Sequence, residues 1–318
     1  MFLMGECCLL RMVVLNLDNL VSFLSSMESL PMSLLRAVIP ATAKKQLRIG
    51  LEYLQSMSLR MALREQGLWE LYDQLGWIAP DLKKQYTSFD IDSEYLLLNV
   101  RGMHAFQIAL VNDAILSIDS ADEPTVLVDI GDSAGTHIRY LHELHKDKDL
   151  KCLSVNVDKE AVQRIREKGL EAVQAWAEDL PSLGVKAGIF ISFEMLEHLP
   201  NPIQFLRNLS YHTSCQALVI TVPYLVQSRI GLHQIRNDIR KHHNPENTHI
   251  FELCPADWRL LFMHAGWAVK RERLYLQYPR RSMFRLMKTV WRTVDFEGFW
   301  GAILTRDHSW SDLCSNEL

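Results

Sequence analysis

The 318-residue chain carries 34 Lys and Arg residues against 38 Asp and Glu residues, which gives a formal net charge of -4. This balance argues against attraction of the whole molecule to nucleic acid and leaves only local basic patches to consider. Hydrophobic residues make up 48% of the chain, with 14 Gly and 11 Pro, so a disordered or fibrous chain is excluded. The length suits one large domain with an appendage, or two smaller domains.

The six Cys residues show no C-x-x-C pair and no regular spacing, so neither a zinc ribbon nor a disulfide framework is indicated. The apolar N-terminal stretch is interrupted by Glu6, Arg11 and Asp18, and no small-residue cleavage site follows it. We therefore expect neither a signal peptide nor a transmembrane span. A cytoplasmic location fits best, with peripheral contact at the inner face of the membrane left open.

The chain changes character between residues 110 and 124. Residues 1–110 are predicted to be a helical arm or cap, because they contain few β-branched runs. Within them, residues 86–107 are rich in aromatic and polar side chains and are interpreted as a cap that closes over a pocket. From Thr125 onward, short apolar runs alternate with helical stretches, as is typical of a parallel sheet. This gives a core domain at 111–308, a basic helical insertion at 279–298 and a tail at 309–318.

The apolar runs of the core domain predict seven strands, at 126–130, 151–157, 172–176, 188–193, 217–222, 267–277 and 299–305. Helices are predicted at 137–145, 159–168, 202–209 and 255–265, and residues 224–247 are predicted to be a polar loop. The expected fold is α/β, a doubly wound Rossmann-like seven-stranded sheet. It is mostly parallel with an antiparallel last strand, and the N-terminal helical region precedes it.

The first strand runs into residues 129–135 (DIGDSAG), and a helix follows. A Gly-containing loop that opens a helix brings backbone amides against an anionic group, so a bound carboxylate or phosphate is expected there. Asp158, at the end of the second strand, can accept hydrogen bonds from both hydroxyls of a ribose. Either feature alone is more often a plain turn or a helix cap, but their order in the predicted sheet indicates nucleoside binding. A dinucleotide is disfavoured because the loop is not G-x-G-x-x-G.

Five features resemble the class I S-adenosylmethionine-dependent methyltransferase superfamily, specifically its type 11 branch, over about residues 124–306. They are the loop 126–135 (VLVDIGDSAG), the acidic Asp158, and residues 177–181 (AEDLP), 194–200 (EMLEHLP) and 248–251 (THIF) with 265–267 (AGW). The resemblance implies a methyltransferase that uses S-adenosyl-L-methionine as its cofactor.

The resemblance also assigns roles to single residues. It implies that Asp129, Gly131 and Gly135 border the methionine end of the cofactor and that Asp158 takes the ribose hydroxyls. In the same way, it implies that residues 177–178 edge the adenine.

These last two positions are Ala177 and Glu178. The resemblance places Glu194 in the segment that floors the pocket near the transferred methyl group.

Three positions depart from the family pattern. Ser133 replaces the middle Gly of the loop, so that a hydroxyl next to the cofactor either weakens binding or adds a hydrogen bond. Trp176 stands where relatives often carry an Asp, and its ring could pack on the adenine instead. Gly188 stands where an Asp usually starts the fourth strand. The adenine side, Glu178 included, is therefore the less certain part of the expected pocket.

Transfer of an activated methyl group needs mainly proximity and alignment, and it needs a base only when the acceptor is a hydroxyl. The motifs place His198 and His249 near the pocket as candidate bases, and a purely structural role for either histidine stays open. A cluster of His242, His243 and His249 lacks a matching carboxylate pattern. No metal site is therefore expected.

Two segments, 36–64 and 280–292, are net basic and suggest contact with a membrane surface or an acidic substrate, although a solvated helix face explains them equally well. By analogy with the branch, the leading hypothesis is O-methylation of a sugar in a surface polysaccharide or glycolipid. The alternatives are methylation of a quinone or other small aromatic, and a catalytically silent cofactor-binding partner of a glycosyltransferase. The sequence lacks the [DN]-P-P-[YF] tetrad of base-amino methyltransferases, so no nucleic-acid partner is expected.

Overall fold

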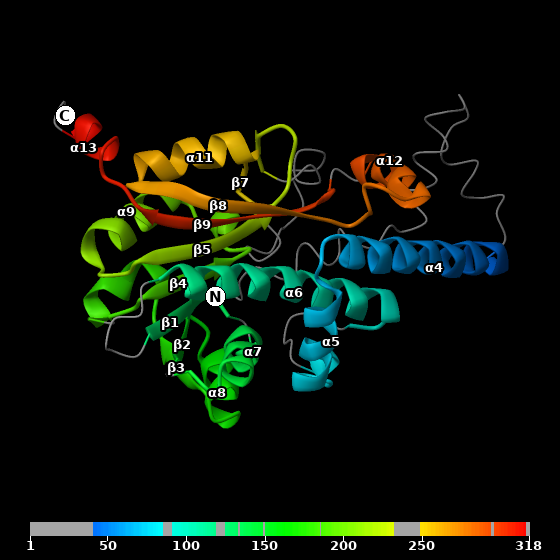
Figure 1. Ribbon diagram of the computed structural model, residues 1–318, viewed down its shortest axis with the longest axis horizontal. Helices are drawn as coiled ribbons and strands as arrows, with labels where there is room; N and C mark the ends of the chain where they lie inside the picture. Colours follow the sequence, from blue (N-terminus) through cyan, green and yellow to red (C-terminus); the bar gives the residue numbers. More distant parts are fainter. Residues whose placement is uncertain are drawn as a thin grey trace.

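The computed structural model describes residues 41–84, 91–118, 125–132, 134–148, 150–184, 186–231, 249–293 and 296–315. Its centre is a seven-stranded sheet with the order β3-β2-β1-β4-β5-β9-β8 (Figure 1). The strands are β1 (Thr125–Ile130), β2 (Leu150–Asn156), β3 (Glu171–Gln174), β4 (Ile189–Phe193), β5 (Ala217–Pro223), β8 (Trp267–Leu276) and β9 (Gly298–Arg306). Neighbouring strands pair in parallel, except that β9 runs antiparallel to both β5 and β8. The predicted fold class is confirmed.

Helices cover both faces of this sheet, as expected for a doubly wound fold (Figure 1). One face carries α6 (Glu94–Ser117), α7 (Thr136–Leu144) and α8 (Lys159–Glu167), and the other carries η2 (Ala177–Leu183), α9 (Pro202–His212) and α11 (Pro255–His264). Along β4, Ile189 and Ile191 join the hydrophobic cluster under α6, and Phe190 joins the cluster under α9 and α11. Because both faces are covered, the strand is apolar throughout instead of alternating with polar residues.

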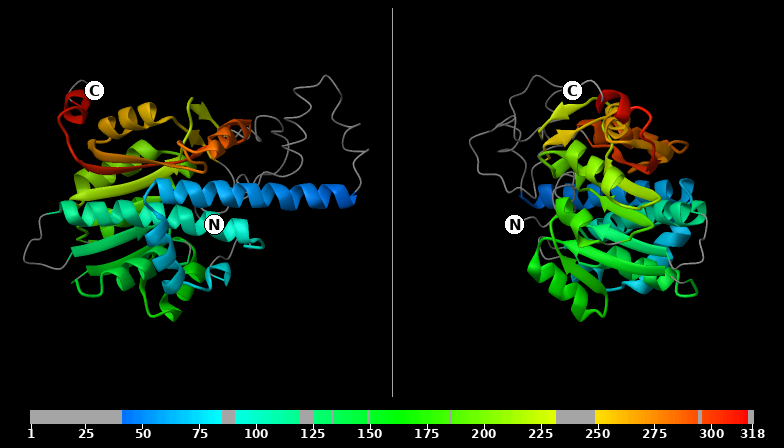
Figure 2. Two further views of the ribbon diagram at one scale, coloured as in Figure 1. Left: turned by 45° about the vertical axis from the view of Figure 1, so that its right-hand side comes forward. Right: turned by 90° about the vertical axis from the view of Figure 1, so that its left-hand side faces the viewer.

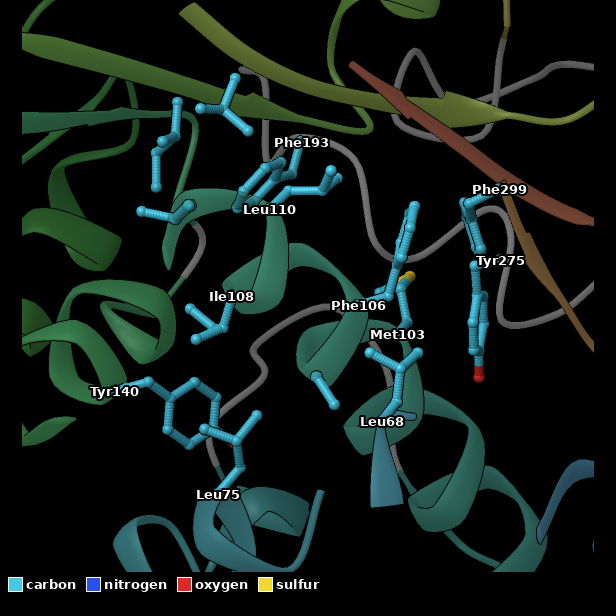
Figure 3. Close-up of a cluster of buried hydrophobic side chains, with 14 of the residues drawn as sticks. Leu68, Leu75, Met103, Phe106, Ile108, Leu110, Tyr140, Phe193, Tyr275 and Phe299 are labelled. Atoms are coloured by element: carbon cyan, nitrogen blue, oxygen red, sulfur yellow. The ribbon is translucent and has the colours of Figure 1, made fainter. Parts of the chain in front are cut away.

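Helix α6 is a core element. Its N-terminus is capped by Ser93, whose Oγ accepts a hydrogen bond from the amide of Leu96 at 3.1 Å. Met103 and Phe106 pack towards the β8–β9 side of the sheet, and Ile108 faces Leu75 of helix α5 (Trp69–Ile78) (Figure 3). Residues 94–107 of the expected cap lie in this helix, where apolar side chains surround most of the helix and most residues are buried. The expected boundary near residue 110 falls inside this helix.

Two elements lie beside the core near the β8–β9 edge. Helix α4 (Ala41–Glu65) projects away from the sheet (Figure 2). The basic insertion consists of η5 (Met283–Leu286) and α12 (Met287–Thr293) between β8 and β9. Glu65, the last residue of α4, links this helix to the insertion. Its carboxylate accepts hydrogen bonds from the amides of Arg280 and Arg281 at 2.9 and 3.0 Å.

The remaining described elements are short: η1 (Leu82–Lys84), η3 (Leu196–His198), α13 (Ser311–Ser315) and a two-stranded sheet of β6 (Arg229–Ile230) and β7 (Phe251–Glu252). Strand β6 lies where the sequence predicts only a loop. Among the described residues, no helix combines the length and the apolar character that crossing a bilayer requires.

Candidate active site

The loop after β1 has the backbone that its glycines allow. Gly131 and Gly135 have φ values of 94° and 72°, in the left-handed region that favours glycine. The amide of Gly131 donates to the carbonyl of Val155 on β2 at 2.9 Å, so the turn is tied to the neighbouring strand. A Cβ on Gly135 would lie 3.1 Å from the side chain of Ile165 on α8, so this position also needs the absence of a side chain for close packing.

Asp132 fills the start of helix α7 with its own carboxylate. Its Oδ1 accepts hydrogen bonds from the amides of Ala134, Gly135 and Thr136 at 3.4, 2.9 and 3.2 Å. These are the amides at which the sequence predicts a bound anion, and they are already engaged by Asp132. Its Oδ2 is buried and has no hydrogen-bond partner in the described part of the chain. The loop therefore offers a buried negative charge, which suits a cationic group better than an anionic one.

Asp129 is turned towards the helix layer. Its Oδ2 lies 3.3 Å from Nδ1 of His137 on α7, and both side chains are buried. His137 Nε2 lies 3.1 Å from Oε1 of Gln107 on α6, and the Gln107 amide donates to Oγ1 of Thr221 on β5 at 3.1 Å. We call Asp129, Asp132 and His137, whose candidate ligand atoms all lie within 4.8 Å of one another, the β1 cluster.

Two polar residues, Asn156 and Asp158, lie at the end of β2 and make different contacts. The last residue of the strand is Asn156, which is buried and whose Nδ2 donates to the carbonyl of Asp132 at 2.9 Å. Asp158 follows as the N-cap of α8, where its Oδ1 accepts the amide of Glu160 at 2.8 Å. The amide of Asp158 donates to Asn156 Oδ1 at 2.8 Å, so Asn156 bridges the glycine loop and Asp158. Asp158 thus has the helix-cap role as well as its predicted place beside the loop.

The expected adenine side is formed by the end of β3 and η2. Ala177 is buried at the first position of η2, and Trp176 before it is 49% exposed, so that its ring presents an accessible face. Glu178 lies in the first turn of η2. Ser133, expected next to the cofactor, lies outside the described residues, as do His242 and His243.

Two carboxylates follow β4. Glu194 adopts a φ of 50°, and it is the one non-glycine residue with a positive φ in the described ranges. Such a conformation costs about 1–3 kcal/mol and persists where the surroundings hold it in place. Glu197 lies in η3, and both side chains are fully buried. Burial raises the pKa of Glu197 to about 7, although nearby His249 favours its charged form.

His198 and His249 meet from different parts of the chain. Their rings are 4.7 Å apart between centroids in an edge-to-face arrangement. The amide of Ile250 donates to the carbonyl of Glu197 at 2.7 Å and fixes this approach. We call Glu197, His198 and His249, whose candidate ligand atoms also lie within 4.8 Å of one another, the η3 cluster. The structure thus brings together both histidines that the sequence nominates.

Glu252 orients His249. Its Oε1 lies 3.1 Å from His249 Nδ1, and its Oε2 accepts a hydrogen bond from Nε of Arg229. Burial would raise the pKa of Glu252, but the hydrogen bonds from His249 and Arg229 outweigh burial and lower it. Glu252 therefore carries a negative charge that holds the His249 ring in place.

Sequence reasoning missed several of these groups. Asp132 and Asn156 are conspicuous only once the loop and the strand end are known to be in contact. Glu252 stands three residues after His249, a spacing that marks a pair only if the short strand β7 is recognised. Arg229 lies in the segment predicted to be a loop.

A cavity of about 490 Å³ lies at the end of β5, and none of its lining residues belongs to the η3 cluster. Its lining includes Tyr224, Arg229, Arg292 and Glu297, so Arg229 connects the cavity wall to Glu252 and His249. A second cavity of about 470 Å³ shares Tyr224 and Glu297 with it and adds basic side chains, among them Arg280. The two cavities share these two residues, and we call them together the basic groove.

Residues 128–213, from within β1 to the end of α9, match a family model described as a methyltransferase domain. This match covers less than half of the chain and agrees with the resemblance to S-adenosylmethionine-dependent methyltransferases that the sequence motifs show.

Solved structures of similar fold include three from microorganisms. The first is a Haloferax volcanii protein in complex with the Trm112 methyltransferase activator (16% identity, TM-score 0.45, 65% of this chain and 93% of that one). The second is an O-methyltransferase from a trans-AT polyketide synthase of Brevibacillus brevis in complex with S-adenosyl-L-homocysteine (12%, 0.45, 69% and 77%). The third is an S-adenosylmethionine-dependent methyltransferase of Mesorhizobium loti (11%, 0.42, 62% and 98%). At these identities none of them identifies a substrate, and no curated protein matches the sequence.

The β1 loop fits this cofactor in one respect that the structure displays. S-adenosylmethionine supplies a methyl group activated on a sulfonium and also carries a positively charged amino group. The buried Oδ2 of Asp132 has no hydrogen-bond partner among the described residues, and a cationic amino group would satisfy it. The loop would thus hold the methionine end of the cofactor mainly through the charge of Asp132.

Proposed function

We propose that this protein is an S-adenosylmethionine-dependent methyltransferase that transfers the methyl group to a sugar hydroxyl of an anionic polysaccharide or glycolipid. The observation that carries the proposal is the basic groove. Its lining includes Arg229, one contact away from His249 through Glu252, and also Arg292 and Arg280 in the insertion. Arg229 and Arg292 are paired with Glu252 and Glu297, but the lining also includes Arg280, Arg285 and Lys288 and stays net basic. This charge suits a phosphorylated or carboxylated saccharide better than a neutral quinone.

In this proposal the cofactor lies along the tips of β1, β2, β3 and β4. Asp129, Gly131, Ser133 and Gly135 would border its methionine end, with Asp132 added by the charge argument above. Asp158, with Asn156 beside it, would face the ribose.

Ala177 and Glu178 would edge the adenine in the same arrangement, with the exposed ring of Trp176 beside them. Glu194 would lie under the transferred methyl group.

His198 and His249 would manage the proton of the acceptor hydroxyl. A sugar hydroxyl is a weak nucleophile, so withdrawal of its proton assists transfer. Glu252 supports this role because it stabilises positive charge on His249, as in an oriented histidine–carboxylate pair. A quinone catechol, being more acidic, would need this arrangement less.

We also propose that α4 and the basic insertion contact an anionic membrane surface. Apolar side chains exposed on α4 include Ile49, Tyr53 and Leu54, and Met283 and Leu286 are exposed on the insertion. Exposed apolar groups beside basic residues are typical of elements that lie in the membrane interface. Co-sedimentation with vesicles containing anionic lipid, compared with zwitterionic vesicles, tests this contact.

The experiment for the substrate is transfer of labelled methyl groups. Purified protein is incubated with methyl-labelled S-adenosylmethionine and, separately, with a lipid-linked glycan fraction and a quinone fraction. We expect label in the glycan, and we expect glycosidase digestion to release this label as a methylated sugar. Label only in the quinone would contradict the proposal, and calorimetric binding of the cofactor without transfer to either would favour a silent binding partner.

A further inference from the structure

The η3 cluster brings metal-binding groups together inside the protein. Glu197 and His198 are adjacent in η3, after β4, and His249 arrives from the segment before β7. All three side chains are buried, and one ligand atom of each lies within 4.8 Å of those of the other two. Groups from two distant segments thus converge on one point inside the protein.

Two carboxylates are buried close together here. Glu194 and Glu197 are both fully buried, and neither Oε1 nor Oε2 of Glu197 completes a hydrogen bond within the described ranges. The groups that come near its carboxylate are His249, its own amide, the carboxyl group of Glu194 and Glu252. Two buried carboxylates side by side are strongly unfavourable unless a proton or a cation lies between them.

Hydrogen bonds to Glu252 orient His249 as a metal ligand. The Nδ1–H of His249 donates to Glu252 Oε1 at 3.1 Å, and Arg229 holds Glu252 from the other side. This fixes the tautomer in which Nε2 carries the lone pair. A carboxylate that accepts the second ring N–H is the usual support of a metal-bound histidine, because it sets the ring orientation and raises the basicity of the ligand.

We propose that Glu197, His198 and His249 bind a divalent transition-metal ion, with Glu194 as a neighbouring carboxylate that adds negative charge. Two imidazole nitrogens and a carboxylate oxygen suit Mn²⁺, Fe²⁺ or Zn²⁺ better than Ca²⁺. Three ligands leave coordination positions open, as in catalytic sites. The expectation of no metal considered the histidines near residue 242, whereas the structure supplies the carboxylates from η3.

The chemical role of this site rests on the proposed function. Neighbouring hydroxyls of a sugar could occupy the open positions, and the cation would then lower the pKa of the acceptor hydroxyl. In the transfer, the acceptor oxygen forms the new O–CH₃ bond while the S–CH₃ bond breaks with its electron pair staying on sulfur. The hydroxyl proton passes to solvent. With the cation bound, the histidines promote loss of this proton by holding the cation, and this is how they manage the proton of the acceptor hydroxyl in the proposed function.

The test is metal binding by the full chain, measured apart from turnover. Protein dialysed against chelator and then buffer is titrated with Mn²⁺, followed by electron paramagnetic resonance of the unbound ion, and then with Zn²⁺ by calorimetry. One equivalent should bind to the wild type. Glu197→Gln and His249→Gln should each weaken binding at least about tenfold. Glu143→Gln on the exposed surface of α7 removes the same charge elsewhere and should bind as the wild type does.

A third variant covers the case in which a ligand variant does not fold. Glu252→Gln leaves all three proposed ligands in place and should weaken binding about 10- to 100-fold. The proposal is overturned if the wild type binds neither ion, or if the Glu197, His249 and Glu252 variants bind as tightly as Glu143→Gln. Stoichiometric metal binding without labelled glycan would refute the proposed substrate and leave the site intact. Labelled glycan formed equally well in excess chelator would refute the site's chemical role instead.

Discussion

The β1 cluster and the η3 cluster consist of similar residue types, are both buried and lie at the same edge of the sheet. They differ in how many hydrogen bonds their carboxylates accept. In the β1 cluster Asp132 accepts three backbone amides, and His137 lies between Asp129 and Gln107. In the η3 cluster the oxygens of Glu197 complete no hydrogen bond within the described residues. Buried polar groups that the protein itself satisfies stabilise a fold, whereas groups left unsatisfied usually await a ligand. The β1 cluster thus combines structural hydrogen bonds with one open oxygen, Asp132 Oδ2, whereas both carboxylate oxygens of Glu197 are open in the η3 cluster.

The largest effect on stability is expected for His137→Ala in the β1 cluster. Its loss would leave Asp129 buried without its histidine, and removing one partner of a buried pair costs about 3–5 kcal/mol. Urea unfolding of the variant and the wild type measures the difference. A loss below about 1 kcal/mol would place His137 outside the structural network.

A smaller loss is expected for Asp132→Ala. The helix start of α7 would lose the acceptor of three amides, and loss of a cap costs about 0.5–2 kcal/mol. The same variant should weaken binding of S-adenosylmethionine in calorimetry, because the buried charge near the loop is gone. If cofactor affinity stayed at the wild-type value, the charge argument for the methionine end would fail.

Asp158→Ala probes the ribose side. Removal of the N-cap of α8 should cost about 1 kcal/mol of unfolding free energy. Cofactor affinity should fall by about 1.5–3 kcal/mol if ribose hydroxyls lose their acceptor. Asp158→Asn, which preserves much of the capping, separates the two effects. Unchanged cofactor binding in both variants would move the ribose contact to Asn156.

The smallest change in stability is expected for Glu197→Gln in the η3 cluster. Removing one of two adjacent buried carboxylates relieves repulsion, so the unfolding free energy should stay within about 1 kcal/mol of the wild type or rise. Methyl transfer should nevertheless fall at least about a hundredfold. A variant that lost stability and kept its activity would reverse the comparison between the clusters.

The order and type of the core elements could be predicted from the sequence because apolar runs buried on both faces leave a strong local signal. β1, β4 and β5 are such runs, and the predicted bounds differ from the observed ones by one residue at most. The burial of helix α6 could not be predicted in this way, because its Asn, His and Gln residues interrupt the apolar pattern. Gln107 and His104 are nevertheless buried, and Gln107 contacts Thr221 of β5. Such a contact has no local signature.

The candidate site shows the same limit. His198 and His249 could be nominated from motifs, because each stands in a recognisable local pattern. Their pairing with Glu252 and Arg229 depends on how β6 and β7 fold back onto η3, a contact between segments far apart in the chain. The roles of Asp132 and Asn156 depend likewise on the proximity of two strand tips.

The burial of α6 also determines how the domain can be cut for study. A fragment restricted to the matched segment 128–213 would lack this helix and strands β5, β8 and β9, which together cover and extend the central strands. It would expose the apolar faces shown in Figure 3 to water and to other copies of itself. A fragment meant to stay in solution should therefore begin upstream of Ser93 and keep residues up to Arg306.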